Sequence, residues 1–242
     1  MKNESETPSH EPSEPSAEAL APGRLDPSAV EAAILQRRTL KVLAGADNPA
    51  VITPEVAERH RATVLDALRI SGWAPFHYDR RVDGLAEPWR AHVLWHEDCQ
   101  RLAPKMTEWF PDIPPTSKIL RMLYGCGALV LVTWLPQFAD EPSPTPKQIA
   151  IDEEHLAAAS AMVQNLLLML TSHGMGTYWS SGGKLGDAKF FERMGLASGQ
   201  RLLAAVFVEY PETLGDARDR VPGKHRDSRS TDWIGEVAVP ST

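Results

Sequence analysis

Cysteine is scarce in this chain, and no metal-ligand spacing accompanies it. Of the 242 residues only Cys99 and Cys126 are cysteines, and they form neither a CxxC pair nor a zinc-binding pattern. This excludes a disulfide-stapled small protein, and we expect two free thiols. His92 and His96 lie close to Cys99 in sequence, but on a strand the two histidines are about 13 Å apart, too far to share one ion. We therefore expect no metal site.

Positive charge and long apolar runs are also limited. Lys and Arg total 25 against 32 Asp and Glu, which gives a formal net charge of −7 and argues against general binding of nucleic acid or anionic membranes. No apolar run reaches about 18 residues, so we expect no membrane span. Walker-type, GxGxxG and GxSxG motifs are missing. The remaining composition is that of an ordinary globular protein.

The amino-terminal segment has almost no large apolar side chains. Residues 1–23 contain five glutamates and one lysine, which accounts for −4 of the net −7, and they are rich in Ser and Pro. Such a segment cannot bury enough surface to offset the entropy of ordering. We predict that residues 1–25 form a disordered acidic leader and that residues 26–242 form one domain. Because the pattern of a secretory or mitochondrial signal is missing, we expect a cytoplasmic protein.

Start and stop signals predict several helices. Asp26 and Thr53 each stand as an N-cap before a proline, and apolar residues follow at helical spacing, in the second case as far as Gly72. A long helix is expected over 148–173, with Gly174 as its stop. Shorter helices are expected within 98–124, where prolines separate two of them, and over 187–194.

Three apolar segments, 90–96, 128–134 and 202–210, predict strands. Strands interspersed with longer helices indicate an α+β or α/β protein. Residues 157–170 of the long helix are apolar on almost every side. This helix must therefore be buried, either inside the domain or between subunits.

Two basic clusters lie far apart in the sequence. The first, Arg37-Arg38-Thr39-Leu40-Lys41, offers forked Arg donors, a Lys charge and a hydroxyl, which suit a phosphate. A solvated helix end is the alternative interpretation. The second, Lys224-His225-Arg226, follows Pro222-Gly223, and a solvated basic loop is its alternative.

Two further stretches could border a ligand. Residues 178–183 (YWSSGG) contain small residues that permit close approach of a planar polar ligand, although a Gly-rich turn between elements is the alternative. Residues 74–77 (APFH) lead on to residues 87–90 (EPWR). A proline-punctuated loop with core aromatics is the alternative there.

The order of these stretches resembles the FMN-dependent nitroreductase family over roughly residues 29–238. Family members carry Arg-Arg-Ser-x-Arg/Lys after the first helix, Ala-Pro-Ser ahead of Gln-Pro-Trp-Arg, Gln-Asn-Leu-Leu-Leu ahead of Gly-x-Gly, and a final Lys-x-Arg. The matching stretches are 37–41 (RRTLK), 74–77 (APFH) with 87–90 (EPWR), 164–168 (QNLLL) with 174–176 (GMG), and 224–226 (KHR).

The resemblance implies an α+β, nitroreductase-like fold with a central mixed sheet surrounded by helices. It implies that the long central helix lies at a homodimer interface and that FMN binds there. Basic and hydroxyl side chains from both clusters would hold the phosphate and reach the ribityl chain and the pyrimidine edge: Arg37, Arg38, Thr39, Lys41, Lys224 and Arg226.

Other roles follow from the same resemblance. The backbone of Ser180, Ser181 and Gly182 would lie along the flavin near N5. Phe76 and His77 would border the flavin from the partner subunit, and His77 is the best candidate for an acid or base. The segment 98–124 would be a lid over the flavin.

The chain departs from the family pattern in one loop. Leu85 and Glu87 stand where the family has Asn and Gln, and Tyr78–Gly84 is inserted. The polar contacts that family members make with the pyrimidine edge of FMN depend on this loop.

The resemblance implies an oxidoreductase that passes hydride from NAD(P)H through FMN to a nitroaromatic, a quinone or a similar flat acceptor, with donor and acceptor using one site in turn (ping-pong). The partners would be a second copy of the chain and a small-molecule acceptor. The altered loop leaves open a specialised flavoenzyme of the same fold, such as a dehydrogenase or a reductive dehalogenase. A non-catalytic flavin-binding interaction protein is a third possibility.

Overall fold

The computed structural model describes residues 27–216, 218–226 and 228–239, so the predicted leader and the cap residue Asp26 lie outside the described part. The helices and strands follow one another as α1 (Pro27–Gln36), β1 (Leu40–Leu43), α2 (Pro54–Ser71), β2 (Trp89–Trp95), α3 (His96–Trp109), α4 (Lys118–Gly125), β3 (Ala128–Trp134), α5 (Pro146–Ser172), β4 (Gly176–Ser180), η2 (Gly183–Gly186), α6 (Ala188–Met194), β5 (Arg201–Glu209), η3 (Pro211–Thr213) and β6 (Asp219–Pro222).

The central sheet has the strand order β2-β3-β5-β4, and all three pairings are antiparallel. β1 and β6 form a separate antiparallel pair. A parallel bridge between Thr39 and Thr177 joins that pair to β4. The α+β class with mixed strand directions is therefore confirmed.

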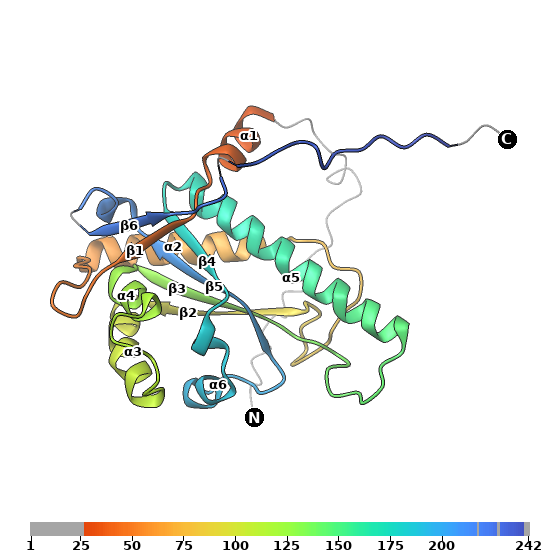
Figure 1. Ribbon diagram of the computed structural model, residues 1–242, viewed down its shortest axis with the longest axis horizontal. Coiled ribbons are helices and arrows are strands. Elements are labelled where there is room, and N and C mark those ends of the chain that lie inside the picture. Colours follow the sequence, from red (N-terminus) through yellow and green to blue (C-terminus); the bar gives the residue numbers. More distant parts are fainter. Residues whose placement is uncertain (1–26, 217, 227, 240–242) are drawn as a thin grey trace, which may run out of the picture.

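Helices cover the central sheet on both faces (Figure 1). Leu129 and Leu131 of β3 belong to the core cluster that includes α3, α4 and α6, whereas Val130 and Val132 belong to the cluster that includes α2 and α5. This alternation follows from the two-residue period of a strand. It explains why β3 is apolar from Ala128 to Val132, since neither face meets water there.

Helix α5 begins with a capping box, in which Thr145 and Gln148 satisfy each other's backbone N–H groups, and the chain turns at Gly174 with φ 73°. Its inner face packs on the sheet through eight buried residues. The outer face, which includes Ala157 and Gln164, stays exposed within the protomer. α5 is also, among the described residues, the helix long and apolar enough to cross a membrane, a criterion that core helices of soluble proteins meet as well.

Three short strands differ from the sequence-based expectation. β1 overlaps the first basic cluster, for which a solvated helix end is the alternative, and β6 ends just before the second. β4 overlaps the stretch 178–183, for which a Gly-rich turn is the alternative. Each has only four or five residues. Such short segments carry little periodicity, so pairing with a neighbouring strand decides their conformation.

Two loop expectations are corrected or refined. The segment 98–124 is not a lid within this protomer, because Phe110 lies in the core and Lys189 of α6 donates to the Trp109 carbonyl at 2.7 Å. The inserted loop is an ordered turn, in which Asp83 and Gly84 both have positive φ and Val82 and Leu85 pair through two backbone hydrogen bonds.

The two cysteines, Cys99 and Cys126, are free and buried, as expected. No group of three His, Cys, Asp or Glu side chains suited to a metal ion occurs in the described part of the chain.

Candidate functional site: a cationic pocket beside a flat pocket

The two basic clusters meet at one pocket of about 720 Å³. The β1–β6 ladder pairs Leu40 with Pro222, and the Gly223 N–H donates to the Thr39 carbonyl at 3.1 Å. This pairing places the residues just before β1 next to those just after β6. The pocket is lined by Arg37, Arg38, Thr39, Leu40, Pro222, Gly223, Lys224, His225, Arg226 and Arg229.

The charge in this pocket is unbalanced. Within the part of the chain that the structure describes, no carboxylate forms an ion pair with any of the five Arg and Lys side chains that line it. Burial, followed by the neighbouring guanidiniums of Arg229 and Arg226, lowers the pKa of Arg37. Guanidiniums that crowd one another without an acidic partner form a site for a multiply charged anion such as a phosphate.

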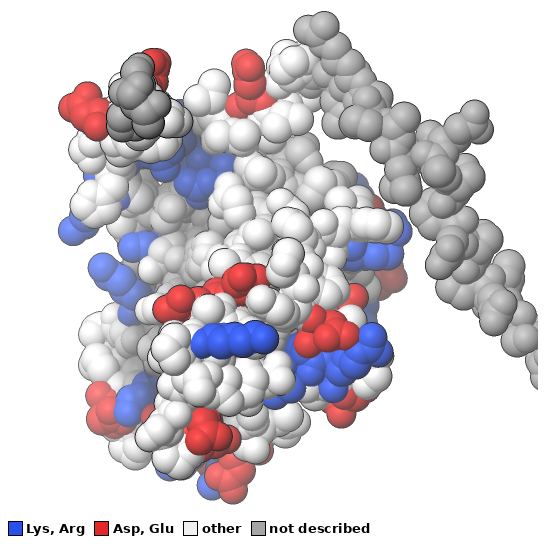
Figure 2. Space-filling model, turned by 90° about the vertical axis from the view of Figure 1, so that its right-hand side faces the viewer, with Lys and Arg blue, Asp and Glu red and all other residues white. Residues whose placement is uncertain are grey.

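This concentration of cations is local. On the face shown in Figure 2, basic and acidic side chains are interspersed in small groups and form no broad area of one sign. That face therefore offers no extended basic surface of the kind that nucleic-acid binding needs.

A second pocket, of about 540 Å³, adjoins the first. Both pockets are lined by Arg37, Thr39 and Arg229. Among its other lining residues Ile34, Leu167, Trp179 and Leu203 are apolar, and Gln164 and Ser181 are polar. The Trp179 Nε1 donates a 3.3 Å hydrogen bond to the Leu203 carbonyl, which fixes the indole. We call the first the cationic pocket and the second the flat pocket. Together they suit a ligand with a phosphate at one end and a planar group at the other.

The turn after β4 shapes the wall of the flat pocket. The Gly182 N–H donates to the Ser180 hydroxyl at 3.1 Å, and Gly182 has φ 85°. A Cβ on Gly182 would lie 2.3 Å from Cδ2 of Leu202, so only glycine fits this close turn. Ser180 is buried and Ser181 is left to line the flat pocket.

Three predicted residues lie elsewhere in the protomer. The Lys41 ammonium sits 4.7 Å from the centroid of the Tyr178 ring and lines neither pocket. Phe76 packs edge-on against Trp89, with ring centroids 5.6 Å apart, and His77 packs against Tyr78. Neither Phe76 nor His77 lines the two pockets.

Comparison with known proteins decides the family. A family model described as the Nitroreductase family matches residues 48–208, which is more than half of the chain. The chain is also 31% identical over 170 residues to YfhC of Bacillus subtilis (strain 168), a protein assigned by name as an NAD(P)H nitroreductase. The alignment covers 68% of this chain and 81% of YfhC. The chain belongs to the nitroreductase family.

Solved structures share the fold of this nitroreductase-family protein at low identity. A nitroreductase-like family protein from Bacillus cereus matches with a TM-score of 0.51 and 20% identity, over 83% of this chain and 94% of that chain. A nitroreductase with bound FMN from Bacteroides fragilis NCTC 9343 matches with a TM-score of 0.52 and 15% identity, over 87% and 98%. These likenesses confirm the nitroreductase-like fold.

Both basic clusters of this nitroreductase-family chain lie outside the matched residues 48–208. Their convergence therefore comes from the strand pairing and is independent of the family match. Arg229, which lines both pockets, is not among the residues predicted from the sequence. The sequence does indicate a third cation at this site, because Arg229 stands three residues after Arg226 on the same polar tail.

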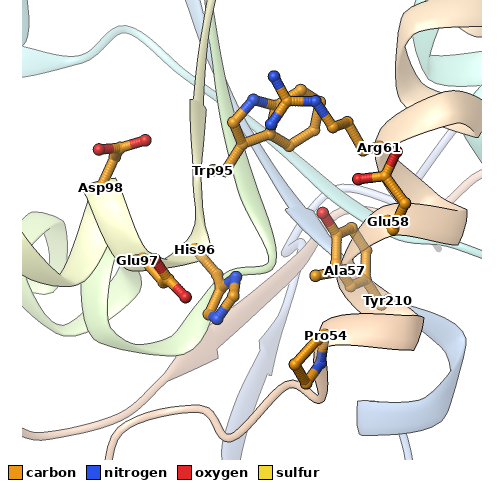
Figure 3. Close-up of a pocket in the computed structure, with 9 residues that line it drawn as sticks. All are labelled: Pro54, Ala57, Glu58, Arg61, Trp95, His96, Glu97, Asp98 and Tyr210. Atoms are coloured by element: carbon orange, nitrogen blue, oxygen red, sulfur yellow. The ribbon is translucent and has the colours of Figure 1, made fainter.

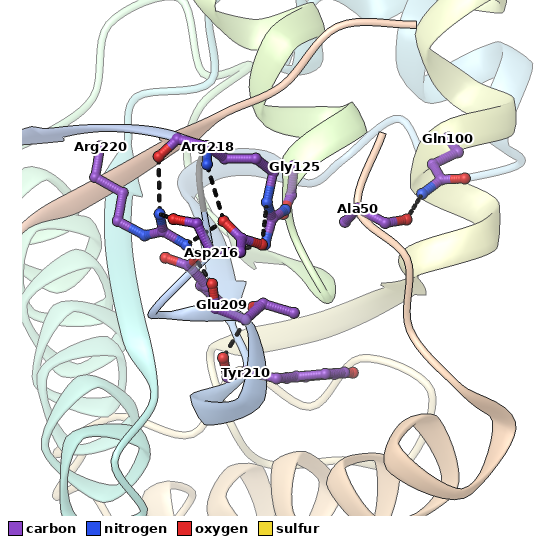
Figure 4. Close-up of polar contacts among 9 residues, drawn as sticks. Ala50, Gln100, Gly125, Glu209, Tyr210, Asp216, Arg218 and Arg220 are labelled. Atoms are coloured by element: carbon purple, nitrogen blue, oxygen red, sulfur yellow. Dashed lines mark hydrogen bonds and ion pairs between the residues drawn. The ribbon is translucent and has the colours of Figure 1, made fainter. Parts of the chain in front are cut away.

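A buried ion-pair network holds β6 in place (Figure 4). Glu209, at the end of β5, is 1% exposed. Its Oε1 accepts from Arg220 at 2.6 Å and lies 3.5 Å from Arg218, and Arg218 also binds Asp216 and the Gly125 carbonyl. Burial raises the pKa of Glu209 against the opposing effect of both arginines. The network fastens β6, and through it one wall of the cationic pocket, to the central sheet.

Another pocket, of about 280 Å³, lies between the starts of α2 and α3 (Figure 3). Glu58, Glu97 and Asp98 outnumber Arg61 among its charged residues. Burial lowers the pKa of His96 against the opposing effect of Glu97 and Asp98, so this imidazole does little to offset the carboxylates. This carboxylate excess would repel a phosphate, so the pocket is unsuited to the anion that the cationic pocket fits.

Proposed function

We propose that this chain is an FMN-dependent oxidoreductase that uses NAD(P)H to reduce a nitroaromatic, a quinone or a similar flat acceptor. The observation that carries the proposal is the convergence around Thr39 of cations that form no ion pair with any carboxylate the structure describes, with the flat pocket directly beside them. Support comes from membership in the nitroreductase family and from the FMN bound in the Bacteroides fragilis relative.

The chemistry of the lining residues fits FMN. Arg37, Arg226 and Arg229 would hold the phosphate, with Lys224 and Arg38 adding charge from the rim, since a dianion needs several cations to offset its desolvation. The Thr39 hydroxyl lies where both pockets meet and suits the chain that links phosphate to ring. Trp179, Leu167 and Leu203 would exclude water from the ring.

When bound, FMN supplies hydride transfer between a nicotinamide donor and the acceptor. For a nitro group the balance is R–NO₂ + NAD(P)H + H⁺ → R–NO + NAD(P)⁺ + H₂O. Among the residues that the structure describes, those that line the flat pocket include neither a carboxylate nor a histidine. The chain therefore orients and desolvates the reactants, and the proton comes from water or from His77 of a second copy. Donor and acceptor would occupy the site in turn.

A homodimer would complete the site. Ala157 and Gln164 on the outer face of α5 are exposed, and so are the large apolar side chains of Ile149 on α5, Leu65 on α2 and Trp73 just after α2. We take these side chains as part of a subunit interface, since contiguous exposed apolar surface marks protein–protein contacts. A second copy docked on α5 would bring its Phe76 and His77 to the flat pocket, which neither residue reaches within its own protomer.

The test is to purify the protein, release any cofactor with heat, and identify it by fluorescence and mass. We expect FMN, and we expect the loaded protein, under anaerobic conditions, to turn over NADPH or NADH repeatedly only when a nitroaromatic or quinone is present. A protein that binds no FMN even after reconstitution contradicts the proposal. Bound FMN that no nicotinamide reduces would favour a specialised flavoenzyme or a binding protein instead.

A further inference from the structure

The pocket of about 280 Å³ between the starts of α2 and α3 is separate from the two pockets proposed for FMN (Figure 3). No described residue that lines it also lines the cationic pocket or the flat pocket. Its volume is near the lower end of the range for small-molecule sites. We call it the α2–α3 pocket, and Glu58, Arg61, Trp95 and Tyr210 are the lining residues that indicate what it binds.

Tyr210 brings a buried hydroxyl to this pocket. The side chain is 1% exposed, and its ring is held by His60, whose ring centroid is 4.5 Å away, and by Gly127, where an added Cβ would lie 2.8 Å from ring atoms of Tyr210. The hydroxyl forms no hydrogen bond with any residue that the structure describes, and in Figure 3 it points into the space between α2 and α3. A hydroxyl buried to this extent needs a hydrogen-bond partner, and a ligand in the pocket can supply one.

Two opposite charges from one helix border the same pocket. Glu58 and Arg61 stand three positions apart on α2, yet neither forms an ion pair with the other or with any other described residue. The Arg61 guanidinium lies instead over the Trp95 ring, 4.9 Å from its centroid. Figure 3 shows both side chains on the side of α2 that faces Trp95 and Tyr210. A ligand that carries charges of both signs would complement both groups.

The other two carboxylates of the pocket already have partners. Glu97 and Asp98 stand in the first turn of α3, where carboxylates suit the positive end of a helix, and they lie 3.9 and 2.5 Å from Arg101. Their remaining charge disfavours a phosphate much more than a zwitterion, because a zwitterion carries no net charge.

The Tyr210 hydroxyl keeps its proton at neutral pH and can donate it in a hydrogen bond. Burial raises its pKa, with Cys126 and Cys99 adding to the effect and Arg61 opposing it. The influence of Arg61 places the guanidinium near the hydroxyl, so both groups can donate to one carboxylate.

We propose that the α2–α3 pocket binds a small apolar α-amino acid as its zwitterion. The carboxylate of the ligand would accept from Arg61 and Tyr210, and its ammonium would donate to Glu58. A short apolar side chain would lie against Trp95 and Pro54. This site is additional to the proposed flavin chemistry and does not depend on it.

Three probes with one carbon skeleton separate the two charges. L-leucine carries both charges, 3-methylbutylamine has the ammonium alone, and 4-methylpentanoate has the carboxylate alone. Glu58→Gln and Arg61→Gln each remove one charge of the pocket, and Tyr210→Phe removes the hydroxyl. The matched controls are Glu192→Gln and Arg193→Gln, because these two residues are exposed on α6 and do not line the pocket.

The readout is calorimetric titration of the full-length protein in the presence of FMN, so that the probes do not compete for the flavin site. We expect the wild type and both controls to bind L-leucine about tenfold more tightly than either analogue. Glu58→Gln should lose the preference over 4-methylpentanoate alone, and Arg61→Gln the preference over 3-methylbutylamine alone. Tyr210→Phe should bind L-leucine about fivefold more weakly with an unchanged midpoint of thermal unfolding, because no described residue bonds to the hydroxyl.

No binding of L-leucine to the wild type at millimolar concentration overturns the site. The same preferences in the wild type, Glu58→Gln and Arg61→Gln overturn it as well. A protein that retains no FMN contradicts the proposed function instead, and the calorimetric comparison then still decides whether the α2–α3 pocket binds an amino acid.

Discussion

Nη1 of Arg226 donates a hydrogen bond to the backbone carbonyl of Arg37 at 3.0 Å, although the two residues are 189 positions apart. The same guanidinium also donates to the Leu35 carbonyl. Arg226 thus satisfies two carbonyls at the end of α1, as basic side chains at helix C-termini often do. Docking of the carboxyl-terminal tail and assembly of the cationic pocket are therefore coupled.

Replacing Gly182 with alanine should destabilise the fold more than an ordinary glycine substitution. The new Cβ would meet Leu202 at 2.3 Å, and the residue has φ 85°. Clash and backbone strain together should lower the free energy of unfolding by about 3 kcal/mol. Urea denaturation measures the change.

The control for that prediction is Gly195→Ala. Gly195 also has positive φ, at 67°, but a Cβ added there would meet no atom within 4 Å. We expect a loss of about 1 kcal/mol from the backbone conformation alone. Equal losses at positions 182 and 195 would mean that the contact with Leu202 is unimportant.

Glu209→Gln should weaken both the fold and FMN retention. The substitution removes the buried carboxylate that Arg218 and Arg220 share, and although Asp216 still pairs with both guanidiniums, the loss should lower the free energy of unfolding by about 2 kcal/mol. Glu108→Gln is the control, because Glu108 is 63% exposed in its pair with Lys105 and its substitution should change stability little. Similar unfolding free energies for the two variants would contradict the role given to Glu209.

Stability should fall as the medium is acidified below pH 6.5 because of His155. This residue of α5 is 1% exposed, and burial lowers its pKa, with Arg80 adding to the effect and Asp152 opposing it. For a base with a lowered folded-state pKa, the unfolded chain takes up the proton first. The contribution of neutral His155 to the free energy of unfolding is therefore fully present above the unfolded-state pKa of about 6.5. It is lost as the pH falls from there through the folded-state pKa.

The measurement compares unfolding free energies at pH 7.5 and pH 5.5 for the wild type, His155→Phe and the exposed control His173→Gln. We expect His155→Phe to lose less stability on acidification than the other two proteins. An identical pH dependence in all three would exclude His155 as the cause.

A charge on the outer face of α5 should separate the subunits. Ala157→Glu places a carboxylate at an exposed position in the middle of the apolar helix, and burying it in an interface is strongly unfavourable. Light scattering should show a dimeric wild type and a monomeric variant that has lost most of its FMN. Ala197→Glu, at an exposed loop position, should remain dimeric; a dimeric, fully loaded Ala157→Glu would refute the interface.

The long elements could be predicted from sequence because their signals are local. Thr53 and Thr145 each accept from a backbone N–H in the first turn of their helix, and the apolar β3 segment is central in the sheet. Local chemistry fixes such boundaries before tertiary contacts act. The meeting of the two basic clusters, which brings Arg226 next to Arg37, could be expected only from the resemblance to a family. No periodicity in the sequence predicts it.

The site could be predicted only in part, because pairing decides which side chains meet. β1 places Lys41 over Tyr178 instead of in the cationic pocket, and the path of the tail after β6 brings Arg229 to both pockets. Neither outcome is encoded in spacing along the chain. Phe76 and His77 remain a prediction, since their proposed role requires a second copy.

The most direct test of the cationic pocket is the affinity of the cofactor-free protein for FMN compared with riboflavin, which lacks the phosphate. Flavin fluorescence gives both dissociation constants for the wild type, Arg226→Ala and the control Arg193→Ala. We expect the wild type and the control to bind FMN at least about 100-fold more tightly than riboflavin, and Arg226→Ala to lose most of that ratio while its riboflavin affinity changes little. Equal affinity of the wild type for FMN and riboflavin would contradict the account.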